Sequence, residues 1–174
     1  TILVTGGAGF IGSHFVHYML RTHPNISIVT LDALTYAGRL ENLSDLEGNT
    51  RQEFAHGDIC DREFVERICN KHHVEAIVNF AAETHVDRSI HSGLEFIKTD
   101  VEGTYTLLTV VRDFGIKKFL HVSTDEVYGD IPAGSFSKET DSLHPSSPYS
   151  ASKAGGELQC LAFHRTYGTP VMIT

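Results

Sequence analysis

Two pairs of side chains in this sequence have the types and spacing of acid–base groups. Tyr149 and Lys153 lie four residues apart at the start of a segment with helical periodicity, so a helix would place them on one face. A free tyrosine has a pKa of about 10, and a lysine cation close to it favours the phenolate and lowers that value. We therefore expect Lys153 to make Tyr149 a base that takes a proton from an alcohol while a hydride leaves.

Asp125 and Glu126 form the second pair, directly after an apolar segment that ends at Ser123. A solvated acidic turn is the common alternative for adjacent carboxyls, but a position at the carboxyl end of a central strand favours chemistry. Two carboxyls in different environments can divide into an acid and a base. The hydroxyl of Thr124 or Ser123 would orient a carbonyl oxygen. Beside a site that oxidises an alcohol, such a pair is suited to the elimination of water.

A glycine-rich turn near the start of the chain is typical of dinucleotide binding. Thr5–Gly12 has the sequence TGGAGFIG, follows an apolar strand and opens a helical segment. It contains GxGxxG at Gly7, Gly9 and Gly12, and a wider GxxGxxG that begins at Gly6. Glycines there allow a tight turn and a close approach to a pyrophosphate, which then lies at the positive end of the helix.

Asp32 strengthens this prediction because it lies 20 residues after Gly12, at the end of the second apolar segment. A carboxylate in that place accepts both hydroxyls of an adenosine ribose and repels a 2′-phosphate, which favours NAD over NADP. Two further turns follow the third and fourth apolar segments. Gly57–Ile59 lies where an adenine edge would be, although by itself it is equally typical of an ordinary turn or helix cap. The small residues of Phe80–Ala82 let a cofactor pass closely.

The elements that must position these groups alternate along the chain, which predicts a parallel sheet. Six short, mostly β-branched segments have the apolar character of buried parallel strands: Ile2–Thr5, Ile26–Leu31, Glu53–His56, Ala76–Phe80, Lys118–Ser123 and Val171–Thr174. Four segments between them have helical periodicity: Phe10–Thr22, Asp61–His72, Leu94–Phe114 and Tyr149–Tyr167. This alternation predicts an α/β fold, a Rossmann-type doubly wound parallel sheet with strand order 3-2-1-4-5-6 and flanking helices.

Two long loops, Asp32–Arg51 and Thr124–Pro148, follow the second and fifth strands. Ligands of open α/β sheets bind at the carboxyl ends of the strands, and loops of this length in a compact domain are usually functional. We therefore expect both loops to border the site.

The composition excludes several classes of protein. With 41% hydrophobic and 21% charged residues, the chain of 174 residues is predicted to be one globular domain. A charge of -8, from 14 basic and 22 acidic residues, argues against nucleic acid and anionic membranes as partners. No apolar run approaches the roughly 20 residues of a membrane span, and the first residues predict a strand rather than a signal peptide. Three cysteines without a CxxC pair favour a reducing cytoplasm, and no residue spacing predicts a metal site.

Five stretches of the chain together resemble the extended short-chain dehydrogenase/reductase family of NAD-dependent epimerases and dehydratases. They are TGGAGFIGSH (Thr5–His14), LDALTYAG (Leu31–Gly38), AAETHVDRSI (Ala81–Ile90), STDEVYGD (Ser123–Asp130) and YSASKA (Tyr149–Ala154). The Asp-Glu pair is the most specific of these features, and it is similar to that of the family's nucleotide-sugar 4,6-dehydratases. The resemblance extends over nearly the whole chain.

The resemblance implies a set of NAD-binding residues at the carboxyl ends of the strands. They are Gly6, Gly7, Gly9, Phe10, Ile11, Gly12, Asp32, Ala33, Leu34, Thr35, Asp58, Ile59, Phe80, Ala81, Ala82, Thr84, Thr99, Tyr149 and Lys153. It also implies that Thr84 and Thr124 contact the substrate. By the same resemblance, Tyr149 is the base for the oxidation and Lys153 holds it in place.

The reaction implied by the resemblance converts dTDP-glucose to a 4-keto-6-deoxy sugar nucleotide and water, with bound NAD reduced and then reoxidised. Asp125 would be the general acid and Glu126 the general base of the elimination. The resemblance further implies a homodimer through the helices 94–114 and 149–167. A UDP-sugar 4-epimerase or a sugar-nucleotide decarboxylase of the same family is an alternative, as is an NAD-binding module without catalysis. The product distinguishes these alternatives, because epimerisation of the sugar releases no water.

Three positions depart from the usual pattern of the family. Ala33 replaces a lysine, Thr84 replaces a serine, and Asp100 lies where asparagine is common. We expect the Asp100 carboxyl either to disturb the site or to face solvent. The chain ends on an apolar run, Pro170–Thr174, that predicts a strand. Because family members continue into a region that covers the sugar nucleotide, we expect residues 1–174 to be the NAD-binding domain with the catalytic residues, without the substrate domain.

Overall fold

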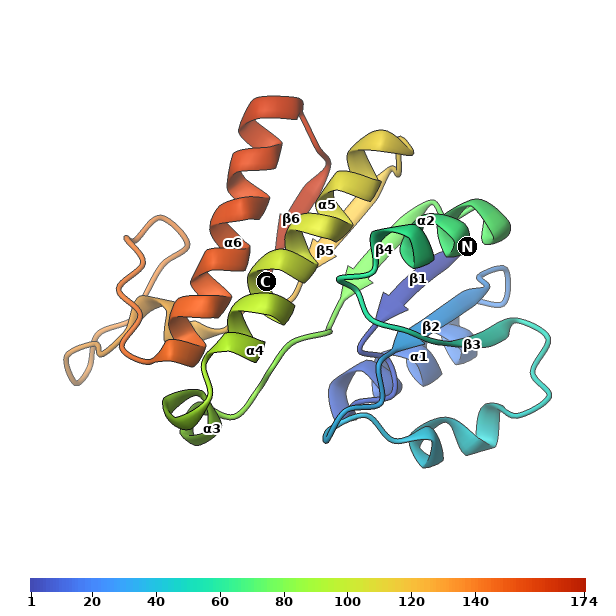
Figure 1. Cartoon of the computed structure of the whole chain (residues 1–174), viewed down its shortest axis with the longest axis horizontal. Helices are drawn as coiled ribbons and strands as arrows, with labels where there is room; N and C mark the ends of the chain where they lie inside the picture. Colours follow the sequence, from blue (N-terminus) through green and yellow to red (C-terminus); the bar gives the residue numbers. More distant parts are fainter.

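A computed structural model describes all residues from 1 to 174 and contains one parallel sheet of six strands (Figure 1). The strands lie in the order β3-β2-β1-β4-β5-β6, which confirms the predicted Rossmann-type sheet. Their bounds are β1 Ile2–Thr5, β2 Ile28–Asp32, β3 Gln52–His56, β4 Ala76–Asn79, β5 Lys118–His121 and β6 Val171–Ile173. Each predicted strand is present, with ends that differ by at most two residues from the predicted ones.

Strand β1 lies at the centre of the sheet and pairs on both edges. Ile2 is opposite Ile28 of β2 and Ala76 of β4, and the register continues to Thr5. All pairs are parallel, so the carboxyl ends of all six strands reach the same edge of the sheet. Any residue that directly follows a strand therefore lies at this edge.

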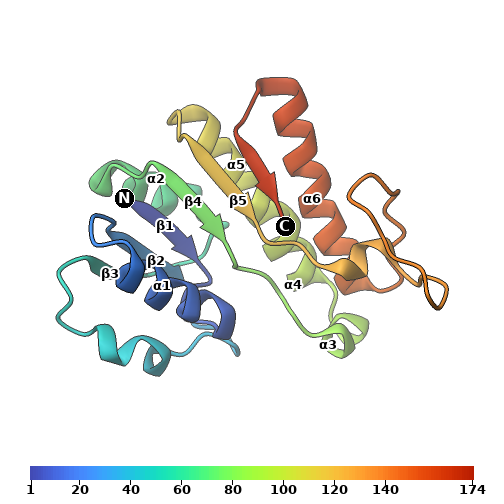
Figure 2. The same ribbon diagram turned by 180° about the vertical axis from the view of Figure 1, so that it is seen from behind.

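Helices cover the two faces of the sheet in separate groups. Helices α2 (Arg62–His72), α5 (Thr104–Asp113) and α6 (Pro148–Tyr167) pack over one face, around buried Leu3 and Phe119. Helix α1 (Phe10–Thr22) and the 3₁₀ segment η1 (Leu40–Leu46) cover the β1–β2 part of the other face, as Figure 2 shows. The alternation of Leu3 and Val4 between these two cores is the period of two expected for a strand buried on both sides. None of the helices is long and apolar enough to cross a membrane.

The single helix predicted over Leu94–Phe114 is wrong in its middle. A short α-helical turn, α4 (Leu94–Phe96), continues into a π-helical segment, η2 (Ile97–Gly103), and only then into α5. A π-helical turn inserts an extra residue into the helix and shifts the phase of the side chains that follow. Hydrophobic periodicity does not separate this geometry from a continuous α-helix.

Three short helical elements lie where the sequence predicted only loops. The 3₁₀ segment η1 lies within the first long loop, and the 3₁₀ turn η3 (Asp125–Tyr128) opens the second. Helix α3 (Val86–His91) follows the loop after β4. Each has seven residues or fewer, too few for a helical period to stand out in the sequence.

Helix α6 begins at a capping box that fixes its first turn. The Ser147 hydroxyl accepts the Ser150 N–H at 3.0 Å, and the Ser150 hydroxyl accepts the Ser147 N–H at 2.9 Å. Pro148 occupies the first helical position, where no N–H is needed. Because Tyr149 and Lys153 lie in the first two turns, this cap also sets where they point.

We expect Ser147→Ala to lower the free energy of unfolding by about 1 kcal/mol, because the Ser150 N–H at the start of α6 loses its acceptor. Denaturant unfolding measures this change. Ser135→Ala, at an exposed loop position, is the matched control and should leave the free energy within about 0.5 kcal/mol of the wild type. Equal stability of the two variants would contradict the role given to the cap.

Candidate active site

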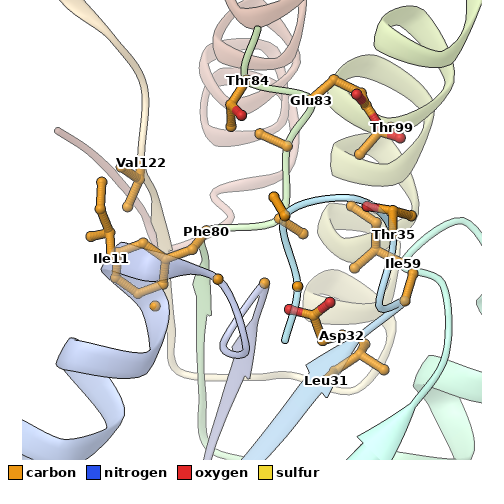
Figure 3. Close-up of a pocket in the computed structure, with 18 of the residues that line it drawn as sticks. Ile11, Leu31, Asp32, Thr35, Ile59, Phe80, Glu83, Thr84, Thr99 and Val122 are labelled. Atoms are coloured by element: carbon orange, nitrogen blue, oxygen red, sulfur yellow. The ribbon is translucent and has the colours of Figure 1, made fainter. Parts of the chain in front are cut away.

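A cavity of about 410 Å³ lies at the carboxyl ends of the strands. Figure 3 shows Asp32, Thr35 and Ile59 toward one end of it and Ile11 and Val122 toward the other. The residues around it come from every loop that follows β1 to β5, and from helix α6. A cavity of this position and size is the usual ligand site of an open parallel sheet.

The glycine turn forms the floor of the cavity because its backbone packs against the loop after β4. Gly6 has a φ of +66°, a left-handed conformation that favours glycine, and a Cβ there would lie 2.6 Å from the Ala81 nitrogen. A Cβ on Gly12 would overlap the Gly6 carbonyl oxygen. Gly7 differs from both, since its missing side chain makes room for Thr30 below the turn, away from the cavity.

Asp32 joins the glycine turn to the loop after β2. One carboxylate oxygen accepts the Ala8 N–H at 2.9 Å and the other accepts the Leu34 N–H at 2.8 Å, while the side chain also lines the cavity. A carboxylate oxygen can accept a second hydrogen bond, so these contacts leave lone pairs for the hydroxyls of a ribose. The same group thus shapes the turn and presents negative charge to the cavity.

Most of the predicted cofactor residues lie together around the cavity. Those that line it are Gly6, Gly9, Phe10, Ile11, Gly12, Asp32, Ala33, Thr35, Asp58, Ile59, Phe80, Ala81, Ala82, Thr84, Thr99, Tyr149 and Lys153. Gly7 and Leu34 do not line it. Leu34 has a φ of 51°, and its N–H donates to the Asp32 carboxylate. Its side chain packs against the core under α1.

Further lining residues were missed by sequence reasoning. They are Leu31, Ala37, Gly38, Glu83 and Val122, together with Ser123, which was named only as an alternative to Thr124. Gly57, which also lines the cavity, belongs to the turn predicted to lie at the adenine edge. Most of them adjoin predicted residues, so proximity along the chain was the available signal. Ala37 and Gly38 reach the cavity because the loop after β2 folds back, and a Cβ on Gly38 would overlap the Asp32 carboxylate.

A polar contact connects the loops after β2 and β4 at the rim of the cavity. The Tyr36 hydroxyl accepts the Thr84 N–H at 3.1 Å and lies 3.3 Å from the Thr84 hydroxyl. The Arg88 guanidinium lies 3.9 Å from the centre of the Tyr36 ring. These contacts fix Thr84, one of the two predicted substrate residues, at the cavity wall.

Lys153 is buried, with 5% of its surface exposed, and its ammonium donates to the Val122 carbonyl oxygen at 2.7 Å. Burial lowers the pKa of Lys153, and the negative charges of Asp100 and Glu157 act in the opposite direction. Helix α6 and the end of β5 therefore hold this cation at the cavity wall, in the place predicted for it.

The expected lowering of the Tyr149 pKa by Lys153 is wrong for this structure. The pKa of Tyr149 is raised, mainly by burial and further by the charges of Glu126, Asp100 and Asp125, while the Thr124 hydroxyl lowers it. The Lys153 ammonium is directed to the Val122 carbonyl instead of the phenol. Tyr149 is therefore a neutral phenol at pH 7.

Asp125 and Glu126 lie on the 3₁₀ turn η3, exposed to solvent beside the cavity. Thr124 caps this turn by accepting the Glu126 N–H at 3.3 Å. None of the three lines the cavity itself. Both carboxyls nevertheless lie near enough to Tyr149 to raise its pKa, so their charges act on one member of the other predicted pair.

Asp100 does not face solvent, contrary to one of the two expectations for it. It is buried in η2, and it accepts hydrogen bonds from the Glu83 N–H and the Ser152 hydroxyl. Burial raises the pKa of Asp100 to about 6. The carboxyl thus forms part of the structure behind the cavity wall.

Comparison with known proteins identifies relatives that cover the whole of this chain. The family model described as GDP-mannose 4,6 dehydratase matches residues 3–174. The low-salt glycan biosynthesis protein Agl12 of Haloferax volcanii is 50% identical over 173 residues, which are 99% of this chain and 54% of that protein. The dTDP-glucose 4,6-dehydratase of Xanthomonas campestris is 50% identical over 183 residues, 100% of this chain and 52% of the enzyme. The chain spans about half the length of these relatives.

Solved structures give the same picture. DesIV, a dTDP-glucose 4,6-dehydratase from Streptomyces venezuelae crystallised with NAD and TYD bound, has a TM-score of 0.93 at 50% identity, over 99% of this chain and 54% of that one. A UDP-glucose 4-epimerase of Thermotoga maritima with UDP-glucose has a TM-score of 0.88 at 35% identity, over 99% of this chain and 53% of that one. The fold is thus shared by dehydratases and epimerases.

We expect Asp32→Ala to lower the free energy of unfolding by about 2–6 kcal/mol, because two backbone N–H groups lose their acceptor and each such loss costs about 1–3 kcal/mol. Denaturant unfolding measures it. Asp130→Ala removes an exposed carboxylate from a loop and should change the value by less than about 0.5 kcal/mol. An Asp32→Ala protein as stable as this control would show that Asp32 does not hold the turn.

Proposed function

Because the chain belongs to the GDP-mannose 4,6 dehydratase family, we propose that its protein is an NAD-dependent 4,6-dehydratase of nucleotide sugars, with dTDP-glucose as substrate. One observation carries the proposal. The glycine turn, Asp32, Tyr149 and Lys153 line a single cavity, and two carboxyls lie close enough to Tyr149 to raise its pKa. The relatives named dTDP-glucose 4,6-dehydratase, at about half identity, support this choice of sugar nucleotide.

The residues around the cavity fit NAD. The cradle formed by Gly6 and Gly12 leaves no room for a Cβ and so brings backbone close to a pyrophosphate. Asp32 retains lone pairs for the adenosine ribose, and its charge disfavours a 2′-phosphate. When bound, NAD would supply the acceptor for the hydride of sugar carbon 4 and return that hydride at carbon 6.

Tyr149 acts in the first step. Its phenolate oxygen takes the proton of the sugar's 4-hydroxyl as carbon 4 becomes a ketone. Because the pKa of Tyr149 is raised, this role needs further stabilisation of the phenolate, and the Lys153 cation at the cavity wall is the group available to supply it. Thr124 and Thr84 would orient the sugar.

Glu126 and Asp125 act in the second step. The new ketone acidifies the hydrogen on carbon 5, and the Glu126 carboxylate takes that proton. Asp125 gives its proton to the 6-hydroxyl, so the carbon–oxygen bond breaks, water leaves and a double bond forms between carbons 5 and 6. The proton held by Glu126 then returns to carbon 5 as carbon 6 is reduced. The product is a 4-keto-6-deoxy sugar nucleotide, and NAD ends in its original oxidation state.

We further propose that the protein is a homodimer through α4, η2, α5 and α6. These helices lie side by side on one face of the molecule in both views (Figures 1 and 2). Their outer side exposes large apolar side chains, Leu94, Ile97, Tyr105, Leu158 and Leu161. A second copy of the same surface would remove them from water.

A cytoplasmic location is proposed on the state of the cysteines. Cys60, Cys69 and Cys160 are all free thiols, and two of them are buried. Free thiols are typical of a reducing compartment. Cell fractionation with an antibody to the protein tests this, and recovery in a secreted or membrane fraction would contradict it.

The complete protein that contains this chain should convert dTDP-glucose to a product lighter by one water, detected by mass spectrometry. Asp125→Asn with Glu126→Gln should reduce product formation by at least about a hundredfold, because general acid–base catalysis is lost. Reduction of bound NAD by the substrate should persist, seen as absorbance of the reduced nicotinamide.

The matched control for this pair is Asp130→Asn with Glu139→Gln, two exposed acids of the following loop, which should leave turnover unchanged. Full dehydration by the Asp125→Asn, Glu126→Gln protein would refute the assignment of roles. A product of unchanged mass from the wild-type protein would favour the epimerase alternative, and a loss of carbon dioxide the decarboxylase.

Leu161→Asp should convert the dimer to a monomer, because it places a charge on an apolar surface that the partner would cover. Leu40→Asp is the control, since Leu40 on η1 is 49% exposed and Leu161 is 50% exposed. Analytical ultracentrifugation of both variants measures the effect. A wild-type monomer, or a dimer that survives Leu161→Asp, would contradict the proposed interface.

A further inference from the structure

Asp100 is a buried carboxyl behind the cavity, and the steps proposed above do not use it. It lies in the middle of the π-helical segment η2, and 2% of its surface is exposed. A buried carboxyl needs a partner for its charge, and π-helical turns are frequent at functional sites. Its surroundings therefore indicate what it does.

Two hydrogen bonds connect Asp100 to the two walls of the cavity. Its Oδ1 accepts the Glu83 N–H at 3.0 Å, and its Oδ2 accepts the Ser152 hydroxyl at 2.5 Å. Glu83 directly precedes Thr84 in the loop after β4, and Ser152 directly precedes Lys153 in α6. One carboxyl therefore fixes the wall that carries a predicted substrate residue against the helix that carries the predicted base.

The direction of the hydrogen bond between Asp100 and Ser152 depends on the charge of Asp100. The Ser152 oxygen also lies 2.8 Å from the Tyr149 carbonyl oxygen, and a hydroxyl has only one proton to donate. When Asp100 is ionised, Ser152 donates to the carboxylate. When Asp100 is protonated, the carboxyl donates to Ser152, which then donates to the Tyr149 carbonyl.

The charges that face Asp100 come from two elements. Lys153 on α6 favours the ionised carboxylate, whereas Glu83 in the loop after β4 opposes it. Tyr149, also on α6, has its pKa raised by Asp100. Among the groups that favour the charged form of Lys153, Asp100 has a larger effect than Glu157.

The stability of the fold does not explain why an ionisable carboxyl lies at position 100. Burial raises the pKa of Asp100 from 3.8 to about 6, so the folded chain is destabilised by the carboxylate charge at pH 7. An amide of the same shape would accept the Glu83 N–H and donate to the Ser152 hydroxyl without this cost. The amide lacks the negative charge of Asp100, which raises the pKa of Lys153 against the lowering caused by burial.

We propose that Asp100 is a positioning residue for the Tyr149–Lys153 pair: its two hydrogen bonds hold the loop after β4 against α6, and its buried negative charge favours the charged form of Lys153. The inference deepens the proposed function, since a charged Lys153 is what that function asks of the site. Its test needs no turnover, so a failure of the proposed reaction and a failure of this role are distinguishable.

The test is the titration of the Lys153 ammonium, followed by NMR on protein labelled with ¹³C at the lysine side chain. A Lys153→Arg sample assigns the signal. Asp100→Asn should lower the pKa of Lys153 by about one pH unit, because an opposite charge nearby is removed. Asp113→Asn, at an exposed carboxylate that pairs with arginines on the surface, should leave it unchanged. Identical Lys153 titrations in the wild type and the Asp100→Asn protein would overturn the proposal.

A second measurement is thermal unfolding of the wild type and Asp100→Asn as a function of pH. Because the pKa of Asp100 is higher in the folded chain than in the unfolded one, its ionisation destabilises the fold above about 6. Asp100→Asn should therefore unfold at a higher temperature than the wild type at alkaline pH. This difference should shrink as the pH falls through about 6 and vanish near 3.8.

Ser152→Ala sharpens this result. This variant lacks the hydroxyl that favours the ionised carboxylate, so the pKa of Asp100 should be higher in it. The difference in unfolding temperature between Ser152→Ala and Asp100→Asn should therefore reach half its full size at a higher pH than the difference between the wild type and Asp100→Asn. An Asp100→Asn protein that is less stable than the wild type by the same amount at every pH would show a packing role alone and would refute the inference.

Discussion

The position of the site depends on the parallel pairing of β1 with its two neighbours. This strand is buried on both faces, and backbone hydrogen bonds connect it to β2 on one edge and β4 on the other. Because the six strands run in the same direction, their carboxyl ends meet at one edge, and the loops after them surround one cavity. A slip of one residue in β1 would exchange Leu3 and Val4 between the two cores and withdraw the glycine turn from the cavity.

The electrostatics of the cavity follow from desolvation. At one end, the negative charge of Asp32 is stabilised by hydrogen bonds from two backbone N–H groups. At the other end, the positive charge of Lys153 is stabilised by the Val122 carbonyl oxygen and by the negative charge of Asp100. Each of these charges is held by groups that are already in place before any ligand binds. A site with fixed charges of both signs can bind a diphosphate-linked ligand and stabilise charge that develops in a reaction without large rearrangement.

The sequence predicted the strands and helices well, but not the conformation and charge of the residues at the cavity wall. The strand Ile2–Thr5 and the helix Phe10–Thr22 have the predicted bounds, because apolar runs and a glycine turn define them within a few residues. The region 94–114 was predicted as one helix, and its π-helical segment was missed because an inserted residue leaves no mark in the hydrophobic period. The expectation for Tyr149 failed for a related reason. Its pKa depends on burial and on carboxyls from another loop, which the spacing to Lys153 does not contain.

The sequence alone determined the order of apolar strands and amphipathic helices and the position of the glycine turn. It also singled out Asp32 and the two candidate acid–base pairs, because each of these features consists of residues close together in the chain or follows a strand directly. The tertiary structure decided how these groups are charged and what they face. It turned Lys153 toward the Val122 carbonyl, placed Asp125 and Glu126 on a turn beside Tyr149, and buried Asp100 between two cavity walls. The reason is physical: a pKa is set by desolvation and by charges within a few ångströms, and those neighbours come from segments that lie far apart along the chain.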